Sequence, residues 1–261
     1  METIELLNSF NTKIKEIYKE FELDCINRLD DSHKIHDKQM LSWHSDIARR
    51  CQIANNMHFD YFKNYDELSY CSDEILYFVA HLYLYKPYLN NPIEDKIWFS
   101  KRFVYPNYVN IGTKRYYMFA DIVSEKLYNY WDRIGDLIAS FFPELISEKR
   151  VFFATAFDVI PEEFQDLDSY KWLKEFRFNA YQDLNGKRKE VVHYTTSINQ
   201  DKWEHLKLDT EEKILAWLKN RNSMADYFRE HIYITIEGFY QTLLLLEKVD
   251  KIKYGNTIVP S

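Results

Sequence analysis

Glycine and proline are scarce in this chain, and their scarcity limits the folds that it can adopt. The 261 residues include only 5 Gly and 6 Pro, and long segments contain neither. An all-β protein needs these residues at frequent turns, whereas helices tolerate their absence. With 46% hydrophobic residues, the chain can also bury a sizeable core. The sequence therefore predicts an all-α fold, arranged as one large domain or two small ones.

Apolar residues recur at helical spacing at the start of the chain. They alternate intervals of three and four, which is typical of a helix that buries one stripe: Leu7, Phe10, Ile14, Ile17 and Phe21. After a polar segment, further helices are expected over 41–57 and 72–85. A loop-rich stretch over 90–112 follows. We therefore predict an N-terminal helical region (residues 1–100) and a second domain (residues 101–261).

The second domain is predicted to be a bundle of four or five helices. Its longest helix should begin at Thr113 as the N-cap and continue to Phe142, because Pro143 follows. The short apolar segment 151–157 is either a strand or a buried turn of helix, since periodicity cannot distinguish them at this length. Further helices are expected over 169–177, 210–218 and, from a cap at Ser223, to 249.

Charge and cysteine usage restrict the chemistry. A net charge of -7 argues against a broad nucleic-acid-binding surface, so any contact with RNA must be local. Lys101–Arg102 and Lys114–Arg115 are candidates to help such a contact, although ordinary solvated charge is the simpler interpretation of each pair. The three cysteines have no close pairing, and the five glycines form no phosphate-binding loop. We therefore expect no disulfide framework, no metal and no cofactor.

The sequence shows no secretion signal and no apolar run of membrane-spanning length. The start of the chain is acidic, and its most apolar run, the four leucines at 243–246, is too short to cross a bilayer. We expect a cytoplasmic protein with no membrane association.

One segment, 187–194, carries residues suited to catalysis. Arginine is a permanent cation that stabilises a phosphate, and histidine exchanges a proton near neutral pH. Arg188 and His193 lie five positions apart, just after an Asn185-Gly186 turn signal. Together they suit metal-independent cleavage of RNA, which supplies its own 2′-hydroxyl nucleophile. With eight histidines in the chain, about one such pair is expected by chance, so the spacing alone is not specific.

Helix geometry raises a question about this pair. Five residues place the two side chains about 140° apart around an ideal helix. Three arrangements resolve this separation. Arg188 bends back toward His193, or it lies in an irregular first turn after Gly186, or a second subunit completes the site.

The segment resembles the HEPN domains of prokaryotic defence and toxin systems. Their signature is an Arg-x4-6-His motif on a helix that follows another helix, and Arg188, Val191, Val192 and His193 fit it. The aromatic helix around 128–138 is similar to the first helix of a HEPN subfamily that carries an additional N-terminal region. The resemblance covers roughly residues 113–250 and implies a bundle that dimerises with its motif helices facing one another.

This chain also departs from the family pattern at two positions. Lys189 stands where many HEPN proteins have Asn, Asp or His directly after the motif arginine. Thr195 stands where toxins paired with nucleotidyltransferase antitoxins have a modified tyrosine, and Tyr194 comes one place earlier.

The resemblance implies an endoribonuclease of a toxin or anti-phage defence system. His193 would be the general acid or base and Arg188 would hold the scissile phosphate, in a homodimer with an antitoxin or regulatory protein as a further partner. The alternative is a catalytically inactive HEPN-like module that binds a partner or RNA. The other candidate site residues are Lys187 and Lys189 for RNA contact, and Tyr194, Asp132 and Asp136 as supporting groups.

Overall fold

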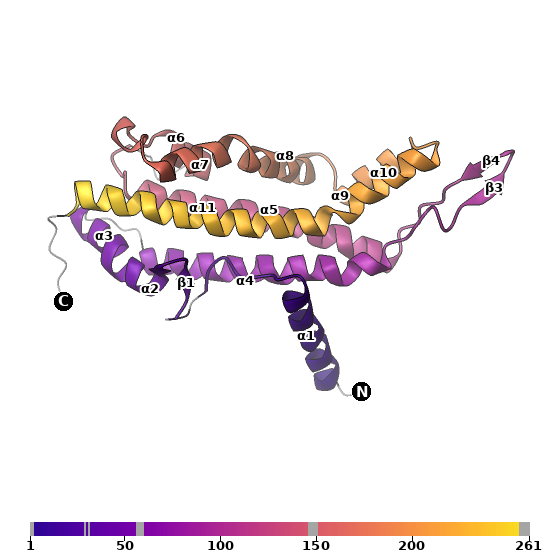
Figure 1. Cartoon of the computed structure of the whole chain (residues 1–261), viewed down its shortest axis with the longest axis horizontal. Coiled ribbons are helices and arrows are strands. Elements are labelled where there is room, and N and C mark those ends of the chain that lie inside the picture. Colours follow the sequence, from indigo (N-terminus) through magenta and orange to yellow (C-terminus); the bar gives the residue numbers. More distant parts are fainter. Residues whose placement is uncertain (1–2, 29, 31, 56–59, 146–150, 256–261) are drawn as a thin grey trace. The chain divides into compact units, whose positions relative to one another are not determined.

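The computed structural model describes residues 3–28, 30, 32–55, 60–145 and 151–255, and these ranges are mainly helical (Figure 1). The all-α prediction is confirmed. The α-helices are α1 (Thr3–Glu20), α2 (Met40–Trp43), α3 (Arg49–Asn55), α4 (Tyr61–Tyr85), α5 (Ile111–Ser140), α6 (Phe153–Asp158), α7 (Asp168–Phe178), α8 (Ala180–His193), α9 (Ser197–His205), α10 (Glu211–Asn222) and α11 (Met224–Lys253). A π-helical turn, η1 (His44–Ala48), joins α2 to α3, and two 3-10 turns are η2 (Lys86–Tyr88) and η3 (Glu162–Phe164).

Two short antiparallel hairpins interrupt the helices. β1 (Lys34–Ile35) pairs with β2 (Lys38–Gln39), and β3 (Ile97–Phe99) pairs with β4 (Arg102–Val104). Both lie in segments that the sequence indicated only as polar or loop-rich. In segment 151–157, for which strand and helix were both open, the residues from Phe153 onward belong to α6, and Phe153 is fully buried.

The first predicted helix is confirmed, but its buried stripe is shorter than expected. Ile14 and Ile17 are 4% and 3% exposed, whereas Leu7 remains 56% exposed. The helix predicted over 41–57 is divided among α2, η1 and α3, and its last two residues lie outside the described ranges.

The longest predicted helix has a different cap from the one expected. α5 begins at Ile111, and the Asn110 Oδ1 atom accepts a hydrogen bond from the Thr113 backbone N–H at 2.7 Å. Asn110 is therefore the capping residue, because its side chain satisfies one of the first free N–H groups of the helix. The Thr113 hydroxyl instead donates to Asn90 Oδ1 at 3.4 Å.

The predicted turn at Asn185-Gly186 is wrong, because α8 continues through both residues. A single glycine costs a helix only about 1 kcal/mol relative to alanine, so packing of the flanking turns is enough to keep it helical. Tyr181 and Leu184 on the preceding turns are buried at 2% and 0% exposure. Arg188 therefore lies well inside a regular helix, which excludes the irregular first turn considered for it.

Contacts divide the chain into two compact units. The first unit comprises 1–24, 75–125 and 186–231, and the second comprises 25–74, 126–185 and 232–261. In the first unit, Ile214, Trp217 and Leu218 of α10 pack against partly buried Ile93, Tyr105 and Leu208. The division between residues 1–100 and 101–261 remains a prediction.

The core of the second unit is built from aromatic rings. Trp131 is fully buried, stacks on Phe176 with ring centroids 4.0 Å apart, and meets Phe153 edge-on at 4.7 Å. Its indole N–H donates to Thr235 Oγ1 at 3.3 Å. Within the described ranges, every helix is too short or too polar to span a bilayer.

Candidate functional site

The motif residues lie on the last turns of α8, in the first unit. Arg188 is half-buried, and His193 is exposed at the final position of the helix. At the C-terminal end of the helix, the Glu190 carbonyl accepts hydrogen bonds from the backbone N–H groups of Tyr194 at 3.0 Å and Thr195 at 2.9 Å. Tyr194 is 83% exposed, and its ring centroid lies 6.4 Å from that of His193. A large substrate can therefore reach the imidazole.

Within one chain, Arg188 and His193 occupy different faces of α8. Because the helix is regular, the five-residue spacing keeps the two Cβ directions about 140° apart. The fold of a single copy does not itself assemble the two side chains on one stripe. The complete site predicted from the sequence thus needs either a bent-back arginine or a second copy.

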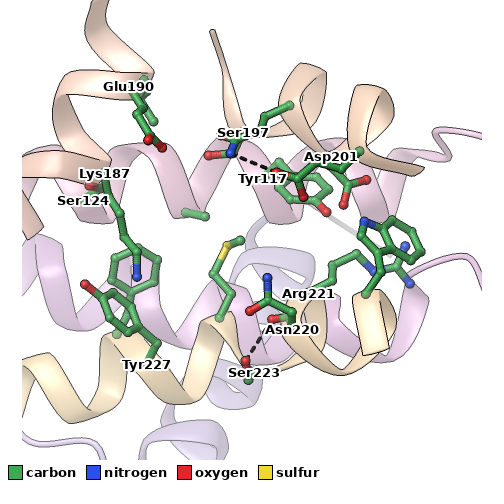
Figure 2. A pocket seen from close by; sticks show the side chains of 17 residues that line it. Tyr117, Ser124, Lys187, Glu190, Ser197, Asp201, Asn220, Arg221, Ser223 and Tyr227 are labelled. Atoms are coloured by element: carbon green, nitrogen blue, oxygen red, sulfur yellow. Dashed lines mark hydrogen bonds between the residues drawn. The ribbon is translucent and has the colours of Figure 1, made fainter. Parts of the chain in front are cut away.

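A pocket of about 240 Å³ lies beside the motif, within the first unit (Figure 2). Residues of α5, α8, α9, α10 and α11 line it, and Lys187, Glu190 and Val191 are the contribution of α8. These three are spaced i, i+3 and i+4, so they form one face of the helix. Neither Arg188 nor His193 lines the pocket. The pocket and the motif therefore occupy different faces of the same helical turns.

The two candidate RNA-binding lysines are placed differently. Lys187 turns toward the pocket, with its Nζ 3.3 Å from the centroid of the Tyr227 ring, in a cation–π contact (Figure 2). Lys189 is exposed on the surface of α8. Both lysines are exposed, but the Lys187 ammonium is already engaged by the Tyr227 ring.

Arg221 is the most deeply buried cation of the pocket, with 4% of its surface exposed. Its terminal nitrogens donate to the Asn90 carbonyl at 2.5 Å and to Asn90 Oδ1 at 3.2 Å, and its guanidinium lies 4.6 Å from the Trp217 ring centroid. Burial lowers its pKa. Sequence reasoning missed this residue, although it had a signal: Arg221 continues the apolar stripe of Ile214, Trp217 and Leu218 at helical spacing.

One buried carboxyl group, Asp201, lines the pocket, and a half-buried one, Asp121, lies beside it. Asp201 is 8% exposed, and burial raises its pKa. Burial and the neighbouring Asp201 raise the pKa of Tyr117, which lies beside it in Figure 2. Asp121 accepts a hydrogen bond from the Ser197 hydroxyl, and burial raises the pKa of this carboxyl as well.

The pocket is suited to a small polar molecule rather than to an RNA backbone. Its volume is below the range of roughly 300–1,000 Å³ that is typical of drug-sized ligands. Carboxylates of Glu190, Asp201 and Glu204 outnumber the two cations, Lys187 and Arg221, and they oppose a phosphate. Among the residues that the structure describes, the buried Trp217 and Arg221 side chains each keep one N–H without an acceptor, at Nε1 and Nε.

Two of the candidate supporting residues, Asp132 and Asp136, belong to the second unit. Asp132 Oδ1 accepts from the Phe153 backbone N–H at 3.4 Å, and Asp136 Oδ2 accepts from Arg133 at 2.8 Å. Burial raises the pKa of Asp136. These contacts hold the first backbone N–H of α6 and the Arg133 side chain of α5 within that unit, and a role for either aspartate at the motif remains a prediction.

One stretch of the sequence gathers several residues of metal-binding type, which are His33, His36, Asp37, His44 and Asp46. In the described ranges, no three His, Cys, Asp or Glu side chains are gathered where they could hold a metal ion. His36 Nε2 instead lies 3.0 Å from Glu237 Oε2, and Asp37 accepts from the Tyr240 hydroxyl at 2.9 Å. These contacts join the β1–β2 hairpin to α11 within the second unit.

Comparison with known proteins gives one positive result. No curated protein and no solved structure gives a significant match. A family model described as Cthe2314-like HEPN matches residues 88–246, which is well over half of the chain. The match includes α5 and α8, the two helices on which the sequence resemblance rested. The chain therefore belongs to the HEPN family.

Proposed function

We propose that this protein is a metal-independent endoribonuclease. The observation that carries the proposal is an exposed His193 at the end of α8, five residues after Arg188, in a chain of the HEPN family. An imidazole on the surface is accessible to a polymer, whereas the neighbouring pocket is too small and too acidic for one. A role in a toxin or anti-phage defence system, with an antitoxin or regulatory protein as partner, belongs to the same proposal.

The proposed reaction uses the substrate's own nucleophile. His193 takes the proton of the 2′-hydroxyl, and the 2′-oxygen forms a bond to phosphorus while the bond from phosphorus to the 5′-oxygen breaks. The leaving 5′-oxygen takes a proton from water, the His193 imidazolium returns its proton to the solvent, and Arg188 stabilises the negative charge that develops on the phosphoryl oxygens. The products carry a 2′,3′-cyclic phosphate and a 5′-hydroxyl.

We further propose that two copies share the site. The 140° separation on α8 is resolved if Arg188 of one copy acts with His193 of a second copy in a homodimer. Lys189, which is exposed beside Arg188, would then contact the RNA backbone near the cleft. Tyr194 lies at the edge of the same surface.

The test is incubation of the purified protein with total RNA and EDTA, followed by analysis of the new ends. We expect cleavage by the wild type, loss of at least a hundredfold in His193→Ala and Arg188→Ala, and near-normal cleavage by His36→Ala, a matched histidine of the second unit. Cleavage that survives both motif substitutions would refute the assignment. Absence of cleavage in every sample would favour the binding module.

Mixing the two inactive variants tests the shared site. Random exchange of subunits makes half of the dimers mixed, and each mixed dimer holds one intact pair in the shared arrangement, so about a quarter of the wild-type activity should return. A pair that acts within one chain gives no recovery, because neither variant contains both groups.

A further inference from the structure

The segment that precedes and opens α5 has an unusual charge. Residues 96–120 contain five cations and no Asp or Glu, in a chain whose net charge is -7. The cations are Lys96, Lys101, Arg102, Lys114 and Arg115. The first three lie in or directly beside the β3–β4 hairpin, which projects beyond the helices of the first unit (Figure 1).

This hairpin also exposes large aromatic rings. Trp98 is 65% exposed, Phe99 64% and Phe103 46%. Trp98 and Phe103 are cross-strand partners whose ring centroids lie 5.0 Å apart at 72°. Rings of this size are usually buried, and a contiguous exposed group of them marks a binding surface.

The cations are interleaved with the rings. Phe99 pairs across the hairpin with Arg102, and the two-residue turn at Ser100 and Lys101 has φ angles of 47° and 66°. Lys101 is exposed at the tip.

The base of the hairpin is fixed to the helices. Lys96 Nζ lies 2.8 Å from Glu211 Oε2 of α10 and 5.1 Å from the Phe103 ring centroid. The Tyr105 hydroxyl donates to the same Glu211 oxygen at 3.4 Å. These contacts leave Lys101 and Arg102 as the cations presented by the free end of the hairpin.

We infer that the β3–β4 hairpin binds single-stranded RNA. The choice of RNA as the ligand rests on the proposed ribonuclease function. Trp98, Phe99 and Phe103 stack on unpaired bases, and Lys101 and Arg102 contact phosphates. Single-stranded nucleic acid is recognised by this combination, because every base has a stacking face and every linkage a negative charge. A hairpin inserted into a membrane would place apolar side chains at its tip, whereas this tip carries a cation that resists entry into lipid. Aromatic rings and Arg are also enriched in protein–protein interfaces, but Lys is depleted there, and this surface presents Lys101 at its tip.

The test measures binding without cleavage, in the full-length His193→Ala protein. The probe is a fluorescein-labelled 12-nucleotide single-stranded RNA, followed by anisotropy at several KCl concentrations. We expect Trp98→Ala to weaken binding about tenfold, from the loss of one stacked base. Lys101→Ala/Arg102→Ala should make the slope of log affinity against log salt shallower by about 1.4, from the loss of two phosphate contacts.

Matched controls are available elsewhere on the chain. Trp203→Ala removes another exposed indole, 62% exposed on α9, and Lys171→Ala/Lys174→Ala removes two exposed cations from α7. Both should bind RNA like the parent. Circular dichroism melting confirms that the hairpin variants remain folded.

The outcomes separate this inference from the proposed function. RNA binding that is unchanged in the hairpin variants, or absent in the parent, overturns the inference whatever the cleavage assay gives. Equal, hairpin-dependent binding of a duplex of the same sequence overturns the single-strand assignment. Hairpin-dependent binding to phosphatidylserine vesicles in place of RNA identifies a membrane surface instead. Hairpin-dependent binding of single-stranded RNA by a protein that never cleaves it supports the inference and refutes only the ribonuclease.

Discussion

Two glycines in regular helices should respond in opposite ways to the same substitution. At Gly186 of α8, nothing lies within 4 Å of the position that a Cβ would take. Alanine gains about 1 kcal/mol over glycine in a helix, so Gly186→Ala should stabilise the protein by about that amount. For a chain of this size the melting temperature should rise by about 2–4 °C.

At Gly238 of α11 the same methyl group meets a buried ring. A Cβ there would lie 2.4 Å from Trp131 Cη2 and 3.0 Å from Trp172 Cζ3. Trp131 cannot easily move aside, because it stacks on Phe176 at 4.0 Å and its indole N–H donates to Thr235 at 3.3 Å. Overpacking costs roughly 1–3 kcal/mol, against a helix-propensity gain of about 1 kcal/mol. Because the overlap is severe, we expect net destabilisation of about 1–2 kcal/mol.

The assay is thermal unfolding followed by circular dichroism at the helical band, with the two variants and the wild type in one buffer. Gly238→Ala should lower the melting temperature by about 2–8 °C while Gly186→Ala raises it. Each residue serves as the control for the other, since the chemical change is identical. A lower melting temperature for Gly186→Ala would refute the continuous α8 helix and favour the turn predicted at Asn185-Gly186. A higher melting temperature for Gly238→Ala would refute the close approach of α11 to Trp131.

Two further predictions concern buried groups of the second unit. Burial lowers the pKa of His44 from 6.5 to about 4, so the imidazole stays neutral in the folded state. The free energy of unfolding should therefore decrease by up to about 3 kcal/mol as the pH falls from 6.5 toward 4, where the unfolded chain binds a proton and the folded protein does not. Urea unfolding at several pH values should show a smaller decrease for His44→Gln than for the wild type. Burial raises the pKa of Cys51 to about 11 and of Cys71 to about 12, and Cys25 is also buried. All three thiols should therefore fail to react with Ellman's reagent in the folded protein and should react in urea. A thiol that reacts fast in the native state would contradict this packing.

The helices could be predicted from the sequence because their evidence is local. Scarce glycine and proline indicate helices, and apolar spacing locates long ones such as α1 and α5. The error at Gly186 has a physical cause, since a single glycine costs a helix only about 1 kcal/mol and the buried residues of the preceding turns outweigh that cost. The cap of α5 was misplaced by three residues because Asn110 and Thr113 are both good capping residues.

The pocket could not be predicted, because its residues come from separate helices. Asp201 lies on α9 and Arg221 on α10, and only folding brings them to one cavity with Tyr117 of α5. Nothing in the local sequence marks Asn90, a loop residue that accepts two hydrogen bonds from Arg221. The motif on α8, by contrast, could be found because Arg188 and His193 lie on one element at a fixed spacing.

The angular positions of the side chains around the α8 axis also indicate how two copies would meet. Lys187, Glu190 and Val191 define the face that lines the pocket, so the opposite face is centred near Lys189 and Val192, and Val192 is 48% exposed. Arg188 and His193 lie about 70° to either side of that outward face. In a two-fold contact through this face with the two α8 helices parallel, each arginine lies on the same flank of the contact as the partner's histidine, about 7.5 Å away along the helix axis. In the proposed dimer, the spacing that separates Arg188 from His193 within one chain would let each arginine approach the partner's histidine, and recovery of activity on mixing the two motif variants depends on that geometry.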